Sequence, residues 1–251
     1  MPPLHRFWCK QFERAPGGAG VLNAEEGRHA LRVLRLKAGN LVQVFDGAGR
    51  QFLAELQGGK PEETRFIVKE ELATADSLIQ PTLALALSKN EKLDFVVQKA
   101  TELGVSRIIP FTCERSVRCI TDAKRAQNKI VRWQRIALNA TKQSGRSRLP
   151  QIAPIVDYAA ALSMMAPCTP RLFCYEKAKT EVLSQSLRSW LARKKPTPAL
   201  LIGPEGGFTA QEAEAALVAN WRAVSLGANI VRCETAALAA LTLLHAAANE
   251  I

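Results

Sequence analysis

The chain is organised around one run of residues near its C-terminus, Ala199-Leu200-Leu201-Ile202-Gly203-Pro204-Glu205-Gly206-Gly207-Phe208. Its apolar start, followed at once by glycines and a proline, predicts a buried strand that ends abruptly in a loop. Thr209 is expected to cap the next helix, because its hydroxyl can accept from a first-turn amide while Glu212 reaches back to Thr209. The same order of strand, loop and helix is predicted again over residues 223–248.

The loops after these two strands, residues 203–208 and 227–234, are predicted to face one crevice. Neighbouring strands of an open parallel sheet carry their following loops at the same edge, where such folds bind ligands. Glycines let the backbone approach a heterocycle closely there, although they could also serve only to turn a strand into a helix. Arg232 and Glu234 favour a functional loop, because a purely structural one does not need two charges beside an apolar helix start.

Motifs in these loops and upstream resemble those of a known enzyme family. They are Leu201–Gly207, Leu226-Gly227, Val231–Ala236, Arg32–Arg35, Phe45–Gly47, Glu102–Val105, Glu114–Ser116 and Gln143–Arg146. Together they resemble the RsmE-type methyltransferases, SPOUT-class enzymes that transfer a methyl group from S-adenosylmethionine to N3 of a uridine in 16S ribosomal RNA of the small subunit. The family commonly has Pro-Arg after Leu-Gly, where this chain has Ala228-Asn229, so the resemblance assigns no residue here to the role of that arginine.

The resemblance implies a fold, a cofactor and a set of site residues. The fold is a SPOUT-type α/β parallel sheet with a C-terminal trefoil knot, preceded by a small PUA-like β-barrel domain. Arg232 is expected to stabilise the developing uracil anion, and Glu234 to orient Arg232, to cap the following helix or to act as the base. S-adenosylmethionine is expected to be bound by Leu201, Ile202, Gly203, Pro204, Glu205, Gly206, Gly207, Leu226, Gly227, Val231, Cys233, Thr235 and Ala236.

The resemblance also implies a homodimer, because in this family a second subunit completes the site at the loop edge. The apolar helix expected over 235–248 fits such an interface and fits a core equally well. Two other functions stay open. One is a SPOUT methyltransferase that modifies another RNA position, such as the ribose 2′-oxygen, and the other is a non-catalytic RNA-binding assembly factor.

The charge of the chain predicts a polyanionic partner. Its 251 residues carry a formal net charge of +11, and without a long apolar span nucleic acid is favoured over a membrane. A basic protein with no such partner is the alternative. The cysteines form no C-x-x-C pair and the three histidines are scattered, so we expect no metal. The N-terminus lacks the apolar core of a signal peptide, which favours the reducing cytoplasm and free thiols.

Residues 1–72 are predicted to form the PUA-like RNA-binding domain. A helix capped by Asn23 is expected over Ala24–Leu36, and strands over 41–45, 51–56 and 65–68 would make a small barrel around the hairpin signal Asp46-Gly47-Ala48-Gly49. The polar segment 70–80, which ends at Pro81, is the predicted boundary.

Residues 81–251 are predicted to form the SPOUT methyltransferase domain. Apolar strands are expected over 82–87, 105–111, 171–175 and 199–202, with helices that begin near Lys89, over 123–141 and over 181–193. Strands that are apolar throughout, rather than alternating, favour a parallel sheet covered on both faces. Neither a P-loop lysine, a Rossmann fingerprint nor a Ser-His-Asp arrangement can be assembled from the sequence.

Basic residues concentrate between Arg115 and Arg148. In the predicted helix over 123–141, three of them recur at i, i+4 and i+7 and would form a cationic stripe, and the following loop adds two guanidiniums. Such a face could be merely solvated, but it coincides with the arginine-containing motifs of the family. The residues expected to contact RNA are Arg32, Arg35, Arg115, Arg118, Arg125, Lys129, Arg132, Arg146 and Arg148.

Overall fold

The computed structural model describes residues 4–74, 77–88, 90–116, 122–178, 183, 187 and 196–250. Arg118 and most of the helix predicted over 181–193 lie outside these ranges. The chain divides into two compact units, Met1–Asp76 with Thr141–Leu149, and Ser77–Ala140 with Pro150–Ile251.

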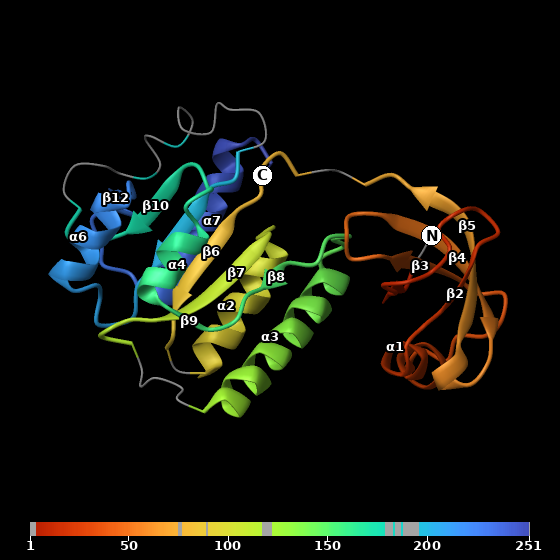
Figure 1. The fold of residues 1–251 in the computed structure, drawn as a ribbon. Coiled ribbons are helices and arrows are strands. Elements are labelled where there is room, and N and C mark those ends of the chain that lie inside the picture. Colours follow the sequence, from red (N-terminus) through yellow and green to blue (C-terminus); the bar gives the residue numbers. More distant parts are fainter. Residues whose placement is uncertain are drawn as a thin grey trace. The chain divides into compact units, whose positions relative to one another are not determined.

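The N-terminal unit is built on a five-stranded sheet with the order β1-β3-β4-β5-β2 (Figure 1). Neighbouring strands are antiparallel except β1, which runs parallel to β3. Phe7, Phe52 and Phe66 are fully buried in its core. The elements are β1 (Arg6–Trp8), β2 (Ala19–Val21), α1 (Ala24–Arg28), the π-helix His29–Val33, β3 (Leu41–Phe45), β4 (Gln51–Gly58), the 3-10 turn Pro61–Glu63 and β5 (Arg65–Leu72).

The first helix begins as predicted but does not continue as predicted. The side chain of Asn23 accepts hydrogen bonds from the backbone N–H groups of Glu25 and Glu26, at 3.0 and 2.9 Å. The expected helix over Ala24–Leu36 is α-helical only to Arg28 and then widens into the π-helix. Arg35 has a φ of 55°, a left-handed conformation that stops a helix.

Residues 141–149 pack onto the β3–β4 hairpin, although they are far from it in sequence. The Arg6 guanidinium donates to the carbonyl of Arg146 at 2.8 Å. The N–H of Leu149 donates to the carbonyl of Gly47 at 3.0 Å, and the Ser147 hydroxyl donates to that of Gly49 at 3.1 Å. These bonds explain why this segment groups with the N-terminal unit rather than with the strands that follow it.

The C-terminal unit contains a seven-stranded sheet with the order β12-β10-β11-β6-β7-β8, and β9 also pairs with β7. All its pairs are parallel, as predicted. The strands are β6 (Thr82–Ala86), β7 (Arg107–Thr112), β8 (Gln151–Ile152), β9 (Val156–Asp157), β10 (Arg171–Cys174), β11 (Ala199–Ile202) and β12 (Arg222–Val224). The helices are α2 (Asn90–Glu102), α3 (Ala123–Gln143), α4 (Tyr158–Met164), α6 (Ala210–Val218) and α7 (Cys233–Ala247).

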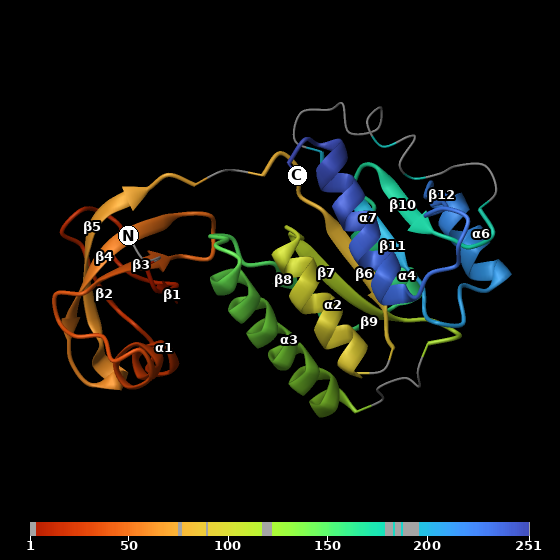
Figure 2. The ribbon, with the colours of Figure 1, turned by 180° about the vertical axis from the view of Figure 1, so that it is seen from behind.

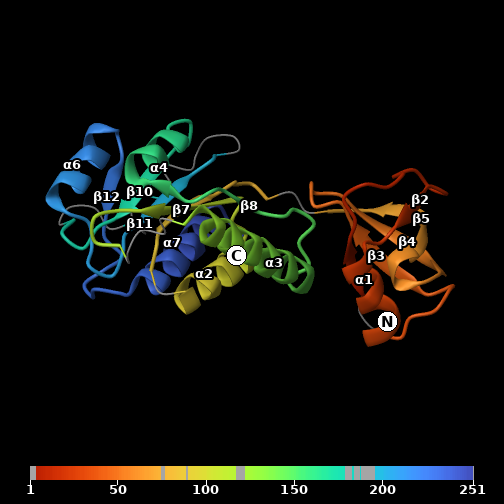
Figure 3. The same ribbon diagram turned by 60° about the horizontal axis from the view of Figure 1, so that its bottom comes forward.

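Helices cover both faces of this sheet, which explains why its strands are apolar at every position. Leu200 and Ile202 of β11 pack into a core with α2, α3 and α7, while Leu201 packs into a second core with α4 and α6. Figures 2 and 3 show α2, α3 and α7 together on one side, and Figure 3 shows α4 and α6 on the other. Both faces of the sheet are thereby buried. The loops that follow the strands lie along the edge where the strands end.

Three further observations concern the described residues alone. None of their helices is both long enough and apolar enough to cross a membrane. Their cysteines are free thiols, Cys119 being outside the described part of the chain. They contain no cluster of side chains suited to a metal ion, and the expectation that no metal is needed stays a prediction.

The end of α7 is tied to the start of the C-terminal unit through Glu250. Its carboxylate accepts from the Ser77 hydroxyl at 2.8 Å and from the N–H of Leu78, and it lies 2.5 Å from Nδ1 of His245. Burial alone would raise the pKa of Glu250, but the bonds from Ser77, His245 and Leu78 outweigh it and lower the pKa from its ordinary value of 4.5.

Replacing Glu250 with Gln is expected to destabilise the fold near neutral pH by about 1 kcal/mol. A lowered folded-state pKa stabilises the fold above the unfolded pKa, and this stabilisation is lost as the pH falls through the lower, folded value. The gap between the Glu250→Gln variant and the wild type should therefore close below pH 4.5. Urea unfolding across the acidic range measures it, and a gap independent of pH would contradict this assignment.

Candidate active site

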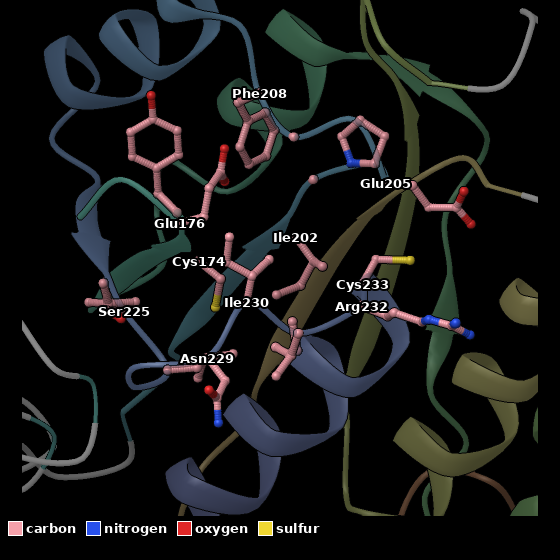
Figure 4. Close-up of a pocket in the computed structure, with 18 of the residues that line it drawn as sticks. Cys174, Glu176, Ile202, Glu205, Phe208, Ser225, Asn229, Ile230, Arg232 and Cys233 are labelled. Carbon is pink, nitrogen blue, oxygen red and sulfur yellow. The ribbon is translucent and has the colours of Figure 1, made fainter. Parts of the chain in front are cut away.

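A pocket of about 460 Å³ lies where β10, β11 and β12 end (Figure 4). Its walls are residues 174–176 after β10, residues 202–208 after β11 and residues 224–233 after β12, with Ala236 of α7. The three strands are parallel neighbours, so the loops that follow them meet at one edge. Both glycine-bearing loops thus line a single pocket, of a size typical for small ligands.

The first loop folds tightly against the pocket. The N–H of Gly207 donates to the carbonyl of Pro204 at 2.9 Å, and Gly207 has a φ of +68°, which favours glycine. A Cβ on Gly203 would lie only 3.0 Å from the ring of Phe208. Arg115 holds the loop from outside by donating to the carbonyl of Gly206 at 3.0 Å. A side chain at Gly203 or Gly207 would therefore collide with Phe208 or Glu176, which also line the pocket.

The helix after this loop begins with the predicted capping box. The Thr209 hydroxyl accepts from the N–H of Glu212 at 3.2 Å, and the Glu212 carboxylate accepts from the N–H of Thr209 at 2.9 Å. Glu212 also accepts from the N–H of Glu114 at 2.9 Å, which joins α6 to the segment after β7. The capping box therefore fixes the exit of the first loop.

Replacing Thr209 with Ala is expected to cost about 1 kcal/mol of unfolding free energy, because the first turn of α6 loses an acceptor. Thr209→Ser keeps the hydroxyl and should retain most of the stability. Chemical denaturation of the two variants beside the wild type measures the difference. Equal losses in both variants would show that the methyl group, and not the cap, stabilises this helix start.

The second loop leads from β12 to Arg232, which occupies the N-cap position of α7 without a capping hydrogen bond from its side chain. Gly227 has a φ of +128°, and its N–H and carbonyl both bond to the Ser225 hydroxyl, at 3.2 and 3.0 Å. Ile230 is 85% exposed beyond this turn. Arg232 is also exposed, and Figure 4 shows it on the same side of the pocket as Glu205, with Glu176 and Phe208 on the other.

Glu234 lies in the first turn of α7, where a carboxylate complements the positive end of the helix. Its Oε2 accepts from the Cys233 thiol at 3.2 Å, and its Oε1 lies 3.9 Å from Nζ of Lys92. Burial alone would raise the pKa of Glu234, but its own backbone N–H, Cys233, Lys92 and Arg232 outweigh burial and lower it. Among the described residues, neither a hydrogen bond nor an ion pair joins Glu234 to Arg232.

Most of the predicted cofactor-binding residues face the pocket, and two do not. Ile202, Gly203, Pro204, Glu205, Gly206, Gly207, Leu226, Gly227, Val231, Cys233 and Ala236 line it. Leu201 is fully buried in the core beneath the sheet, and Thr235 is exposed outside the pocket. Sequence reasoning missed Cys174, Tyr175 and Glu176, although they stand at the end of a predicted strand that shares the same edge.

The cationic stripe predicted on α3 is partly neutralised. Arg132 donates to Asp94 at 2.9 Å, and the Trp133 indole donates to the other oxygen of the same carboxylate at 3.0 Å. Arg125 lies 3.5 Å from Asp122. The Lys129 ammonium lies 6.0 Å from the centre of the Trp133 ring. The helix therefore presents fewer uncompensated cations than its sequence indicates.

The remaining RNA-binding candidates of the N-terminal unit are Arg32, Arg35, Arg146 and Arg148. Arg32 and Arg35 are exposed. Arg146 is half-buried, and burial together with Arg148 lowers its pKa to about 10. The Arg148 guanidinium covers Gly49, since a Cβ there would lie 2.8 Å from it. Both of the latter arginines therefore stand beside the β3–β4 hairpin.

Known proteins are similar to this chain in sequence and in fold. The profile of the RNA methyltransferase domain matches residues 75–245, and that of the RNA methyltransferase PUA domain matches residues 22–67. Ribosomal RNA small subunit methyltransferase E of Bacillus subtilis is 31% identical over 93% of this chain and 91% of its own length.

Two solved structures are similar over nearly the whole chain. Ribosomal RNA small subunit methyltransferase E of Neisseria gonorrhoeae, bound to S-adenosylmethionine, has 30% identity and a TM-score of 0.85 over 97% of both chains. A putative methyltransferase of Legionella pneumophila, in complex with the same cofactor, has 29% identity and a TM-score of 0.86 over 97% of this chain and 98% of its own.

These matches define an RNA methyltransferase with a PUA-like domain joined to a parallel α/β domain. The chain belongs to the ribosomal RNA small subunit methyltransferase E family. The resemblance that the loop motifs indicated is thereby confirmed.

Proposed function

We propose that this enzyme transfers a methyl group from S-adenosylmethionine to N3 of a uridine in 16S ribosomal RNA of the small subunit. The observation that carries the proposal is the single pocket lined by the two glycine-bearing loops, residues 203–208 and 227–234, with Arg232 on its rim. These two segments are called the signature loops. The names of the relatives support the ribosomal substrate, and the structures with bound cofactor support the methyl donor.

The pocket suits S-adenosylmethionine. Gly203 and Gly207 line the cavity, and Ile202, Leu226 and Ile230 offer apolar walls for a heterocycle. Glu176 adds a carboxylate, which favours a ligand with a positive sulfonium centre. The cofactor would supply an activated methyl group, so that positioning and charge control are the tasks left to the protein.

Arg232 is proposed to stabilise the negative charge that develops on the uracil carbonyl oxygens when N3 loses its proton. An exposed guanidinium at the pocket rim can donate to those oxygens without any rearrangement of the core. Glu234 is proposed to position the start of α7. A carboxylate with a lowered pKa is a weak proton acceptor, and its contacts with Cys233 and Lys92 support a structural task.

RNA is proposed to contact both units through basic side chains. In the C-terminal unit the candidates are Arg115, Arg118, Arg125, Lys129 and Arg132. In the N-terminal unit they are Arg32, Arg35, Arg146 and Arg148. Phosphate contacts of this kind would make binding weaken with added salt. Because Arg125 and Arg132 already pair with aspartates, the exposed Arg32, Arg35 and Arg148 of the N-terminal unit are the stronger candidates.

We also propose, from the family, the domain bounds, the knot, the oligomeric state and the cellular location of the protein. These are an RNA-binding domain over 1–72, a methyltransferase domain over 81–251 with a trefoil knot at its C-terminal end, a homodimer and action in the cytoplasm. The exposed Ile230 and Val231 in the second loop support a second subunit beside the pocket. Light scattering coupled to gel filtration should give twice the mass of one chain, and the monomer mass would reject the dimer.

The reaction product tests the proposal. Small ribosomal subunits from a strain that lacks this enzyme are incubated with the purified chain and S-adenosylmethionine, digested to nucleosides and separated by mass spectrometry. The expected product is N3-methyluridine. A 2′-O-methylated nucleoside would point to another SPOUT activity, and no incorporation beside full RNA binding would point to an assembly factor.

A further inference from the structure

We propose that Lys92 is a positioning residue that joins the two signature loops and keeps Glu234 from pairing with Arg232. The proposal rests on the proposed function for the roles of the loops and of Arg232. It assigns Lys92, which lies outside both loop motifs, a part in preparing the site.

The contacts of Lys92 link three separate segments. Lys92 lies in the first turn of α2, and its ammonium pairs with the carboxylate of Glu205 in the first loop. The same ammonium lies 3.9 Å from the carboxylate of Glu234 at the start of α7. Its side chain is 27% exposed and that of Glu234 is 17% exposed, so the second contact is partly shielded from solvent.

A lysine in the first turn of α2, where Lys92 stands, does not stabilise that helix. The N-terminal end of a helix carries partial positive charge, which a nearby cation opposes and an anion complements. Helix stability therefore does not explain an ammonium at this position. The carboxylates of Glu205 and Glu234 do explain it. Their attraction for the ammonium outweighs its repulsion by the helix end and holds the Lys92 side chain between the two loops.

The consequence for the site is a separation of charges. Glu234 follows Arg232 by two residues, and without another cation the two opposite charges would attract each other. Lys92 and the Cys233 thiol instead occupy the two oxygens of Glu234. The Arg232 guanidinium is thereby left to face the substrate, while Glu205 and Glu234 stay anchored to α2.

The first test measures the loops and needs no RNA. Hydrogen exchange is followed in the free wild type, in Lys92→Met and in Lys99→Met. Lys99 is the matched control, because it lies on the same helix and pairs with Glu102 away from the pocket. Faster exchange over residues 203–208 and 232–236 is expected in Lys92→Met alone. Unchanged exchange in Lys92→Met, or equal acceleration in both variants, would overturn the proposal.

The second test measures methyl transfer. Lys92→Met should lower kcat about ten-fold, whereas Lys99→Met and Lys92→Arg should stay within about three-fold of the wild type. Lys92→Arg keeps the cation between Glu205 and Glu234, so a near-normal kcat in this variant beside the loss in Lys92→Met separates an effect of charge from a simple structural loss.

The outcomes separate this inference from the proposed function. A wild type that gives no methylated uridine rejects the proposed function, and the exchange measurement still decides whether Lys92 joins the loops. An active wild type beside an equally active Lys92→Met rejects the inference alone. A loss of kcat in Lys92→Arg as large as that in Lys92→Met would also reject it. Circular dichroism of each variant confirms that it is folded.

Discussion

Replacing Arg232 with Ala is expected to lower kcat for methyl transfer by about 10²–10³-fold, the usual cost of removing one donor to a developing negative charge. The dissociation constant for S-adenosylmethionine should change by less than about three-fold, because the side chain is exposed at the rim rather than packed inside the pocket. The loss should therefore belong to the transition state and not to cofactor binding.

Single-turnover kinetics and calorimetry measure the two quantities on the same preparation of Arg232→Ala. Arg232→Lys is the informative companion, since a lysine keeps the charge and loses the planar, forked donor. An intermediate kcat is expected for the lysine variant. Equal losses of kcat and of cofactor affinity in Arg232→Ala would reject the assignment, because they would place Arg232 in the cofactor site.

Replacing Gly227 with Val is expected to weaken S-adenosylmethionine binding about 30-fold. The φ of +128° at Gly227 is a conformation that residues with a Cβ rarely adopt, and forcing one there costs about 1–3 kcal/mol. Nothing lies within 4 Å of an added Cβ, so the effect must come from the backbone and not from a steric block. The loop would take another path and move Leu226 out of the pocket wall.

Gly39→Val is the matched control for this variant. Gly39 also has a positive φ, +85°, and also has open space around it, but it lies in the N-terminal unit. Both variants should lose stability, and only Gly227→Val should lose cofactor affinity. Calorimetric titration of the two proteins decides the matter, and unchanged affinity in Gly227→Val would remove the second loop from the proposed site.

The sheet of the C-terminal unit and the start of α6 could be predicted because local patterns determine them. Ala199–Ile202 forms a strand over the predicted residues, and its apolar character follows from helices on both faces. The capping box of Thr209 and Glu212 depends on two residues that are three positions apart, so it could be predicted equally well. The loops that follow parallel strands lie at one edge of the sheet, so both loops line one pocket even though β10 lies between β11 and β12, which the sequence had suggested as neighbours.

Features that depend on long-range contacts could not be predicted. β1 and β2 are only three residues long, and pairing with distant strands gives them their structure. The docking of residues 141–149 depends on Arg6, a residue far away in sequence. Likewise, Asp94 neutralises Arg132 from another helix, so the apparent charge of α3 overstated its surface charge. The role of Lys92 could not be predicted for the same reason, because its partners Glu205 and Glu234 are far away in the sequence.

The third wall of the pocket shows where the prediction stopped too early. The strand over residues 171–175 was predicted, and its position between β11 and β12 was not. Strand order comes from packing of the whole unit, so sequence alone gave no reason to place Glu176 beside the glycine loops. A prediction that β10 lies between β11 and β12 would have placed residues 174–176 in the wall of the pocket.

The central claim is that both signature loops together hold the methyl donor, and hydrogen exchange with and without S-adenosylmethionine tests it most directly. Residues 203–208 and 225–232 are both expected to exchange more slowly when the cofactor is added, while the β3–β4 hairpin of the N-terminal unit stays unchanged. Protection of only one loop, or protection confined to another part of the chain, would contradict the account.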